Sequence, residues 1–190
     1  ESKTGGDDDS KPVLIGIASD WGSGTWESAA VASLMASHSP DFTFHMGDVY
    51  YEAMENEIKS AIMGLPPNDK QVGVTWPQGS KGTFHINGNH EMLSLGKGYF
   101  EFLLPENNQK ASFLSVENKY WRVIGLDSGY ESYNVFEKIT AIDELSETDA
   151  PQPEEIINWL NNTLNLGESC KTDNRGIILM SHHMPFSDFI

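Results

Sequence analysis

Short apolar runs alternate with segments of helical spacing along the first half of the chain. Residues 13–17, 42–46 and 83–86 predict strands, and the unbroken run at 13–17 is typical of a strand that is buried on both faces. Residues 26–37 and 52–63 have helical spacing, so that a predicted helix connects each strand to the next. This alternation predicts an α/β sandwich built on a mostly parallel, buried sheet.

The second half of the chain adds a hairpin, a helix and a last strand. Residues 111–116 and 120–126 predict the two strands of the hairpin, which are joined by a polar turn. Residues 153–166 predict a helix, because a proline and an acidic first turn suit a helix N-terminus. Residues 176–181 are the last apolar run and predict a strand.

Three segments follow neither pattern. Residues 1–11 are polar and acidic with two glycines, and they predict a flexible tail ahead of a single domain at residues 12–190. Residues 64–81 form a long loop rich in glycine and proline, and residues 131–153 are acidic and irregular. Loops of this length in compact domains are more often functional rims than plain connectors, so we expect both to border a site.

The composition limits the classes of function. Twelve Lys and Arg residues against 28 Asp and Glu residues give a formal net charge of −16 at pH 7. Nucleic-acid binding is not expected, because phosphate backbones need clustered basic side chains, and a phosphate ester would need bound cations to attract it. The single cysteine, Cys170, excludes a disulfide within these residues. No apolar run approaches the roughly 20 residues that span a bilayer.

Side chains that suit metal binding follow four of the predicted strands. They are Asp20, Asp48 with Tyr51, Asn89 with His90, and His182 with His183. Open α/β sheets build their sites at the carboxyl ends of their strands, where these residues would meet. Carboxylate, imidazole and amide groups suit hard or borderline cations, and two such ions can clamp a phosphate between them.

Other residues of the same types receive a structural interpretation. A single Asp after a strand is usually a turn former, and Asp127 is interpreted in this way. His45 and His85 fall within strands and are interpreted as packed or hydrogen-bonded histidines. We interpret Tyr50 as an aromatic residue at the edge of the core.

Two motifs resemble those of a known family. Gly-Asp-x-x-Tyr at residues 47–51 and Gly-Asn-His-Glu at residues 88–91, followed by an apolar strand that ends in His182, resemble the calcineurin-like metallophosphoesterase superfamily. The resemblance implies an α/β/β/α sandwich. Most members have Asp-x-His after the first strand, whereas this chain has Asp20-Trp21-Gly22. In that respect it is similar to the purple acid phosphatase branch, in which the tyrosine replaces the histidine as a ligand.

The resemblance implies a role for each candidate residue. Asp20 and Tyr51 would bind the first metal ion, Asp48 would bridge both ions, and Asn89 and His182 would bind the second. Asn89, His90 and His183 would contact the substrate, with His90 as the catalytic residue and Glu91 orienting it. The branch typically pairs iron(III) with a second iron, zinc or manganese.

The implied activity is the hydrolysis of small-molecule phosphate monoesters, as in acid phosphatases, with a hydroxide that bridges the two ions as the nucleophile. One alternative is a phosphodiesterase or nucleotidase on the same scaffold. Another is a binding module that has kept the fold without the chemistry. The resemblance favours a secreted or periplasmic location.

One motif of the family does not occur in this sequence. Members complete both sets of metal ligands with a Gly-His-x-His turn downstream of the residue that corresponds to His182, and these 190 residues contain no such turn. We therefore expect residues 12–190 to be the N-terminal portion of a longer catalytic domain. A C-terminal segment would supply the missing turn, and the second sheet would be incomplete in this chain.

Overall fold

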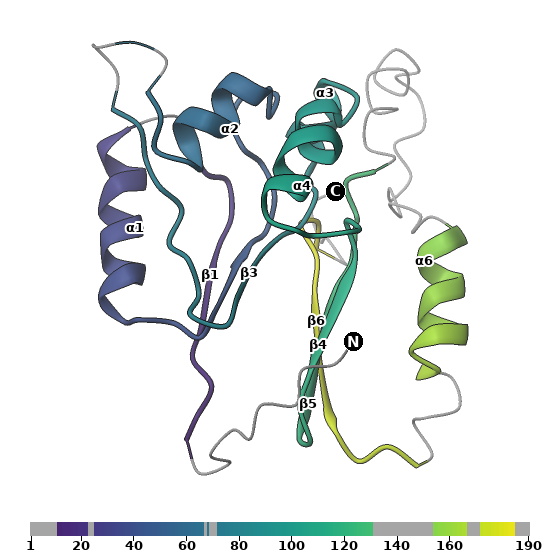
Figure 1. Cartoon of the computed structure of the whole chain (residues 1–190). Coiled ribbons are helices and arrows are strands. Elements are labelled where there is room, and N and C mark those ends of the chain that lie inside the picture. The colour runs from purple at the N-terminus through teal and green to yellow at the C-terminus, as the bar shows by residue number, and fades with distance from the viewer. Residues whose placement is uncertain are drawn as a thin grey trace, which may run out of the picture.

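Two three-stranded sheets with helices on their outer sides make up the fold (Figure 1). The structure is a computed structural model that describes residues 11–22, 25–66, 68, 72–130, 154–166 and 172–184. The strands are β1 (Ile15–Ala18), β2 (Phe42–His45), β3 (Gly82–His85), β4 (Leu114–Glu117), β5 (Trp121–Gly125) and β6 (Gly176–Met180). The helices are α1 (Trp26–Ser37), α2 (Glu55–Ala61), α3 (Asn89–Leu93), η1 (Tyr99–Leu103), α4 (Leu104–Glu106), α6 (Glu154–Asn158) and η3 (Trp159–Thr163), of which η1 and η3 are π-helical. The predictions for residues 1–10 and 131–153 lie outside the described residues.

The first sheet is parallel throughout, in the order β1-β2-β3, as the alternation of strands and helices predicts. Ile15 pairs with Phe42, and Phe42 pairs with Gly82, so that the three strands end at the same edge. The prediction that β1 is buried on both faces is wrong, because Ile17 keeps 52% of its surface exposed. Among the described residues, β1 is an edge strand of its sheet and pairs only with β2.

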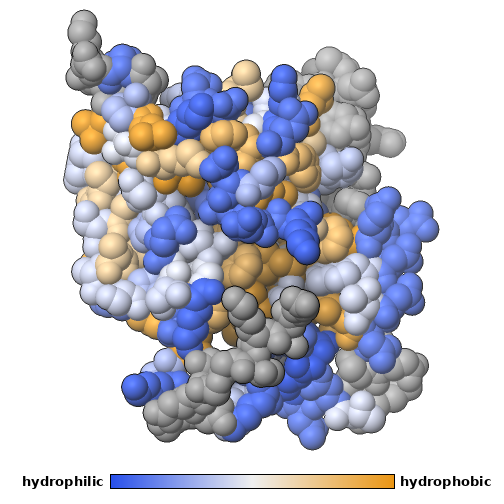
Figure 2. Space-filling model, viewed as in Figure 1, coloured by the Kyte–Doolittle hydropathy of each residue, from blue (hydrophilic) through white to orange (hydrophobic). Residues whose placement is uncertain are grey.

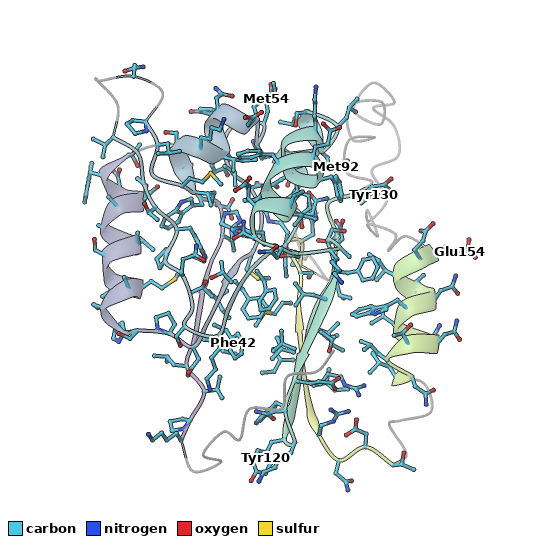
Figure 3. All side chains as sticks on the ribbon, in the orientation of Figure 1. Phe42, Met54, Met92, Tyr120, Tyr130 and Glu154 are labelled. Atoms are coloured by element: carbon cyan, nitrogen blue, oxygen red, sulfur yellow. The ribbon has the colours of Figure 1, made fainter. Side chains whose placement is uncertain are left out.

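The second sheet combines both strand directions. β4 and β5 form the predicted antiparallel hairpin, and β6 runs parallel to β5. The chain itself therefore forms three strands of the second sheet. Side chains from the two sheets fill the space between them (Figure 3), and the buried apolar ones are Phe44, Met46, Ile86, Val123 and Met180. This arrangement confirms the α/β class that the sequence predicts.

The helices follow the sequence pattern with shifted ends. α1 has the predicted bounds, whereas α2 begins at Glu55 instead of residue 52. The reason is that Glu57 accepts hydrogen bonds from three backbone N–H groups of the preceding turn and holds that turn out of the helix. α6 continues directly into η3, and together they cover most of the helix predicted at residues 153–166.

The helices cover the outer sides of the two sheets. α1 lies beside the first sheet and α6 beside the second (Figure 1). Trp159, at the start of η3, packs against Phe113 with ring centroids 4.9 Å apart. A second apolar core lies between the first sheet and its helices around Trp76, which has no exposed surface. The outer surface of α6 is hydrophilic (Figure 2). No helix in the described part of the chain is long and apolar enough to cross a membrane.

Candidate metal centre

The turns after β1 and β2 lie against each other at the carboxyl edge of the first sheet. The backbone N–H of Asp20 donates to the Gly47 carbonyl at 3.0 Å, and the N–H of Trp21 donates to the Asp48 carbonyl at 2.7 Å. Asp20 and Asp48 have positive φ values, 56° and 64°, in the left-handed region that Asp tolerates better than most residues. The parallel strands thus bring both carboxylates to one edge of the sheet.

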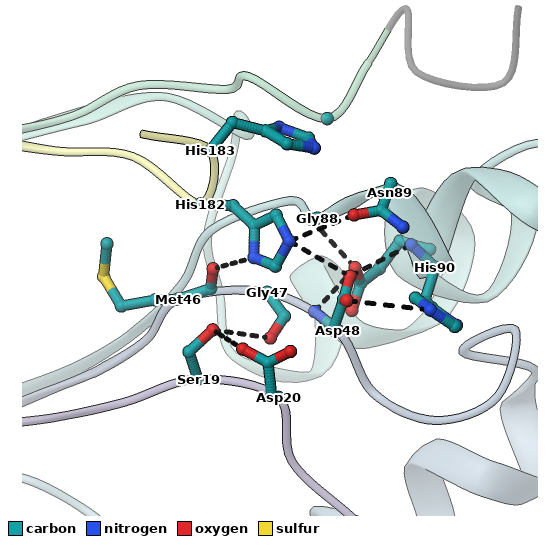
Figure 4. A network of polar contacts seen from close by, with 12 residues as sticks. Ser19, Asp20, Met46, Gly47, Asp48, Gly88, Asn89, His90, His182 and His183 are labelled. Atoms are coloured by element: carbon teal, nitrogen blue, oxygen red, sulfur yellow. Dashed lines mark hydrogen bonds and ion pairs between the residues drawn. The ribbon is translucent and has the colours of Figure 1, made fainter. Parts of the chain in front are cut away.

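A backbone oxygen orients His182, which follows β6. The Nδ1 atom of His182 lies 2.9 Å from the Met46 carbonyl oxygen. Because that oxygen can only accept a hydrogen bond, Nδ1 carries the hydrogen, and Nε2 of the neutral ring carries a lone pair. This Nε2 atom lies 3.1 Å from Asn89 Oδ1 and 3.5 Å from Asp48 Oδ1 (Figure 4).

Three atoms that carry lone pairs therefore converge from three strand ends. With a neutral imidazole none of them donates a hydrogen to another, so the set needs a second proton on the ring or a cation between its members. Carboxylate, amide and imidazole groups together fit a metal ion, and a ligating histidine commonly donates its other N–H to a carbonyl. Among the described residues, no three or more His, Cys, Asp or Glu side chains form a cluster suited to a metal. The converging set contains two such side chains, and its third donor is the amide of Asn89.

Two hydroxyl groups hold Asp20. Ser19 Oγ donates to Asp20 Oδ2 at 2.6 Å, and the Tyr50 hydroxyl donates to Oδ1 at 2.9 Å. Burial alone would raise the pKa of Asp20, but these hydrogen bonds and the nearby His182 and His90 lower that pKa below its ordinary value. Burial and the hydrogen bond to Asp20 raise the pKa of Tyr50 to about 12. The Tyr50 phenol therefore stays protonated and acts as a donor.

The hydroxyl that reaches Asp20 belongs to Tyr50, which corrects the interpretation of Tyr50 as an aromatic residue at the edge of the core. The spacing of the motif points instead to Tyr51, which keeps 68% of its surface exposed. Tyr51 contributes its backbone oxygen, which lies 2.6 Å from His90 Nδ1. Motif spacing is the one sequence signal that distinguishes two adjacent tyrosines, so the contact of Tyr50 could not be found from the sequence.

His90 lies beside the Asp48 carboxylate. Its backbone N–H donates to Asp48 Oδ1 at 3.0 Å, and its ring Nε2 lies 3.8 Å from Asp48 Oδ2. Because the Tyr51 carbonyl accepts the hydrogen of Nδ1, the ring presents Nε2 to the site. The Tyr50 ring packs edge-on against His90, with centroids 4.5 Å apart. His90 is therefore next to the converging donors and is not one of them.

His183 is the second histidine of the pair after β6. Its ring lies edge-on to the ring of His182, with centroids 4.8 Å apart. The backbone N–H of His183 donates to Ser128 Oγ at 3.0 Å, and its Nδ1 lies 3.1 Å from the same oxygen. Burial and the neighbouring His182 lower the pKa of His183. Nothing in the sequence singles out Ser128, which reaches the site because β5 and β6 are neighbours in the second sheet.

Glu91 binds backbone groups, which corrects the expectation that it orients His90. Its carboxylate accepts hydrogen bonds from the backbone N–H groups of Asp48 at 2.9 Å, Val49 at 2.8 Å and Gly88 at 2.8 Å. Burial raises the pKa of Glu91, although these hydrogen bonds oppose the shift. Glu91 therefore joins the turn after β2 to the turn after β3.

His45, His85 and Asp127 have the structural environments that the sequence predicts. Both histidines lack exposed surface and lie beside Trp76. Burial lowers the pKa of both rings, in the case of His85 to about 4. Asp127 is buried in the turn after β5, where it accepts hydrogen bonds from Asn87 Nδ2 and from backbone N–H groups of its own turn.

The comparison with known proteins identifies a family. The model of the family described as calcineurin-like phosphoesterase matches residues 13–189. That range contains Asp20, His90 and all of the converging donors. No curated protein and no solved structure matches the chain.

Proposed function

The chain belongs to the calcineurin-like phosphoesterase family, and from this premise we propose that it is a phosphomonoesterase of the purple acid phosphatase type. Members of the family hydrolyse phosphoesters with the help of metal ions, generally two. The proposal goes beyond the family in two respects. It assigns small phosphate monoesters as substrates, and it assigns a dinuclear metal centre to the residues at the strand ends.

The convergence of Asp48, Asn89 and His182 is the observation that carries the proposal, because these three would hold one metal ion. Asp20 would hold the other, together with the shared Asp48 carboxylate and a tyrosine phenol. Bound ions supply Lewis acidity, which lowers the pKa of water and offsets the charge of the phosphate. With a net charge of −16, the protein needs such cations to attract an anionic ester.

We propose that His90 delivers a proton to the leaving group. Its Nδ1–H is engaged by the Tyr51 carbonyl, so a second proton can only reside on Nε2, which faces Asp48 Oδ2 at 3.8 Å. As the bond from phosphorus to the ester oxygen breaks, this proton would pass to that oxygen. The product would then leave as an alcohol or phenol instead of an alkoxide.

Asn89 and His183 would contact the phosphate. The Oδ1 atom of Asn89 faces His182, so that its Nδ2 points away from the converging donors and can donate to a phosphate oxygen (Figure 4). The His183 ring lies beside the same cluster, where it would close one side of the substrate site. These positions support their roles as substrate-binding residues.

The absence of a histidine in Asp20-Trp21-Gly22 supports the purple acid phosphatase branch, and with it an iron(III) ion paired with iron(II), zinc or manganese. We propose Tyr51 as the phenolate ligand of the iron(III) ion. Tyr51 is assigned by the spacing of the motif, and in this structure the Tyr50 hydroxyl instead donates a hydrogen bond to Asp20 at 2.9 Å. Binding would require the exposed Tyr51 side chain to turn toward Asp20.

Metal analysis and paired substrates test the proposed function. Elemental analysis of the natural full-length protein is expected to find close to two transition-metal ions per chain. Removal of these ions with a chelator should abolish hydrolysis of an aryl phosphate monoester, and adding them back should restore it. A metal content near zero would overturn the enzymatic proposal. Faster turnover of the matching aryl diester would show that the enzyme is a phosphodiesterase and not a phosphomonoesterase.

A further inference from the structure

The Glu91 side chain connects the turn of Asp48 to the turn of Gly88, 40 positions later in the sequence. It has no exposed surface, and its oxygen Oε2 accepts hydrogen bonds from the backbone N–H groups of Asp48 at 2.9 Å and Gly88 at 2.8 Å. Oxygen Oε1 accepts the N–H of Val49 at 2.8 Å. All three hydrogen bonds lie in the interior, where burial keeps water from competing for them.

The two turns are also packed without spare room. A Cβ atom on Gly88 would lie 2.3 Å from Asp48 Oδ1 and 2.7 Å from its backbone nitrogen. A Cβ atom on Gly47 would lie 2.7 Å from the Gly88 nitrogen and 2.9 Å from His182 Nδ1. Small changes in the spacing of the turns would therefore move Asp48 relative to the donors that follow β3 and β6.

We propose that Glu91 is a positioning residue that sets the distance between the Asp48 carboxylate and Asn89, and thereby the affinity of the site for its metal ion. It acts through the backbone of Asp48, not through the ring of His90. The inference rests on the proposed function, because it assumes that Asp48 and Asn89 hold the same ion.

The amide variant Glu91→Gln gives the direct test. Its side chain has nearly the same shape, but its NH₂ group must face at least one of the three backbone N–H groups, so that at least one hydrogen bond is lost. The dissociation constant for Mn²⁺, measured by isothermal titration calorimetry on the metal-depleted full-length protein, is expected to rise about 10- to 100-fold. An unchanged dissociation constant would overturn the inference.

Two further variants separate this effect from general loss of stability and from an effect on His90. Asp41→Asn makes the same chemical change at a carboxylate that accepts the backbone N–H of Leu14 near the start of β1, and it should leave Mn²⁺ affinity unchanged. His90→Gln should also leave Mn²⁺ affinity unchanged while it lowers kcat. If Glu91→Gln resembles His90→Gln in both measurements, Glu91 acts on His90 and the inference is wrong.

Gly88→Ala tests the same contact from the other turn. The φ value of Gly88 is −110°, which alanine adopts without strain, so the added Cβ acts through its contacts with Asp48 and with Glu91 Oε2, which it would approach to 2.9 Å. Mn²⁺ affinity is expected to fall in this variant as in Glu91→Gln. Equal affinity in the wild type and in Gly88→Ala would contradict the tight spacing on which the inference depends.

Hydrogen exchange on the unchanged protein covers the case in which the variants do not fold. The amides of Asp48, Val49 and Gly88 are expected to exchange slowly, because Glu91 binds all three in the interior. Fast exchange at these positions would overturn the inference without any metal measurement. If the wild type binds no Mn²⁺ but the three amides are protected, the proposed function fails and the contact between the turns stands.

Discussion

His182 Nε2 and Asn89 Oδ1 lie 3.1 Å apart, although 93 positions separate the two residues in the chain. Their contact joins the end of β6, in the second sheet, to the start of α3, which follows β3 of the first sheet. The candidate site therefore spans both sheets. Its geometry depends on the apolar packing between the two sheets. That packing includes Ile86, which shortly precedes Asn89 in the chain, and Met180, which shortly precedes His182.

The two histidines after β6 are expected to respond differently to removal. His182→Ala takes away a donor of the converging set, so metal affinity should fall by more than the roughly 10- to 100-fold typical of residues that only support a ligand. His183→Ala should keep the metal and raise KM, because its ring lies beside the set. Elemental analysis and steady-state kinetics on both variants check this. If only His183→Ala loses the metal, His183 is the metal ligand and His182 is not.

Removal of the His90 ring is expected to affect the chemical step and not metal binding. In His90→Gln, kcat for an aryl monoester should fall about 100- to 10,000-fold, because the leaving oxygen loses its proton donor. Metal content should stay at the wild-type level. The loss should be smaller for a substrate whose phenol is a better leaving group, since that oxygen needs the proton less. Equal losses for good and poor leaving groups would argue against proton donation by His90.

The neighbouring tyrosines form a matched pair of variants. A phenolate bound to iron(III) absorbs visible light, and this band should vanish in Tyr51→Phe and persist in Tyr50→Phe. In Tyr50→Phe the Asp20 carboxyl loses one of the hydrogen bonds that lower its pKa, so the acid limb of the pH–rate profile should move to higher pH. If the band is lost in Tyr50→Phe alone, the iron(III) ligand is Tyr50, whose phenol lies on Asp20.

The buried His85 predicts that the free energy of unfolding falls in mild acid. Its pKa is about 4 in the fold, against an ordinary value of 6.5. Between these values the unfolded chain binds a proton that the folded ring does not, so stability is complete above about pH 6.5 and is lost as the pH falls toward 4. A shift of this size corresponds to about 3 kcal/mol.

Urea unfolding at several pH values measures this contribution. The free energy of unfolding should depend less steeply on pH in His85→Gln than in the wild type, because one titrating group is removed. The control is His38→Gln, since His38 is exposed at the end of α1 and its replacement should leave the slope unchanged. Parallel curves for all three proteins would contradict the prediction.

The order of the elements could be predicted because it depends on local patterns. The α1 helix, the hairpin β4-β5 and the parallel first sheet follow from apolar periodicity and from the need of each connecting helix to pack on its sheet. The burial of β1 could not be predicted in this way. An apolar run looks the same at the edge of a sheet and at its centre, and Ile17 is exposed because β1 is at the edge.

The chemical types of the donors, and the strand ends to which they belong, can be predicted from the order of residues alone. Asp20, Asp48 and Asn89 follow three parallel strands, and such strands bring their carboxyl ends to one edge whatever the details of packing. How each donor is held depends on contacts that form when the chain folds. The Met46 carbonyl orients His182, Glu91 binds the Asp48 turn, and Tyr50 reaches Asp20. These are hydrogen bonds between residues far apart in the chain, and their geometry exists only once the two sheets have packed together.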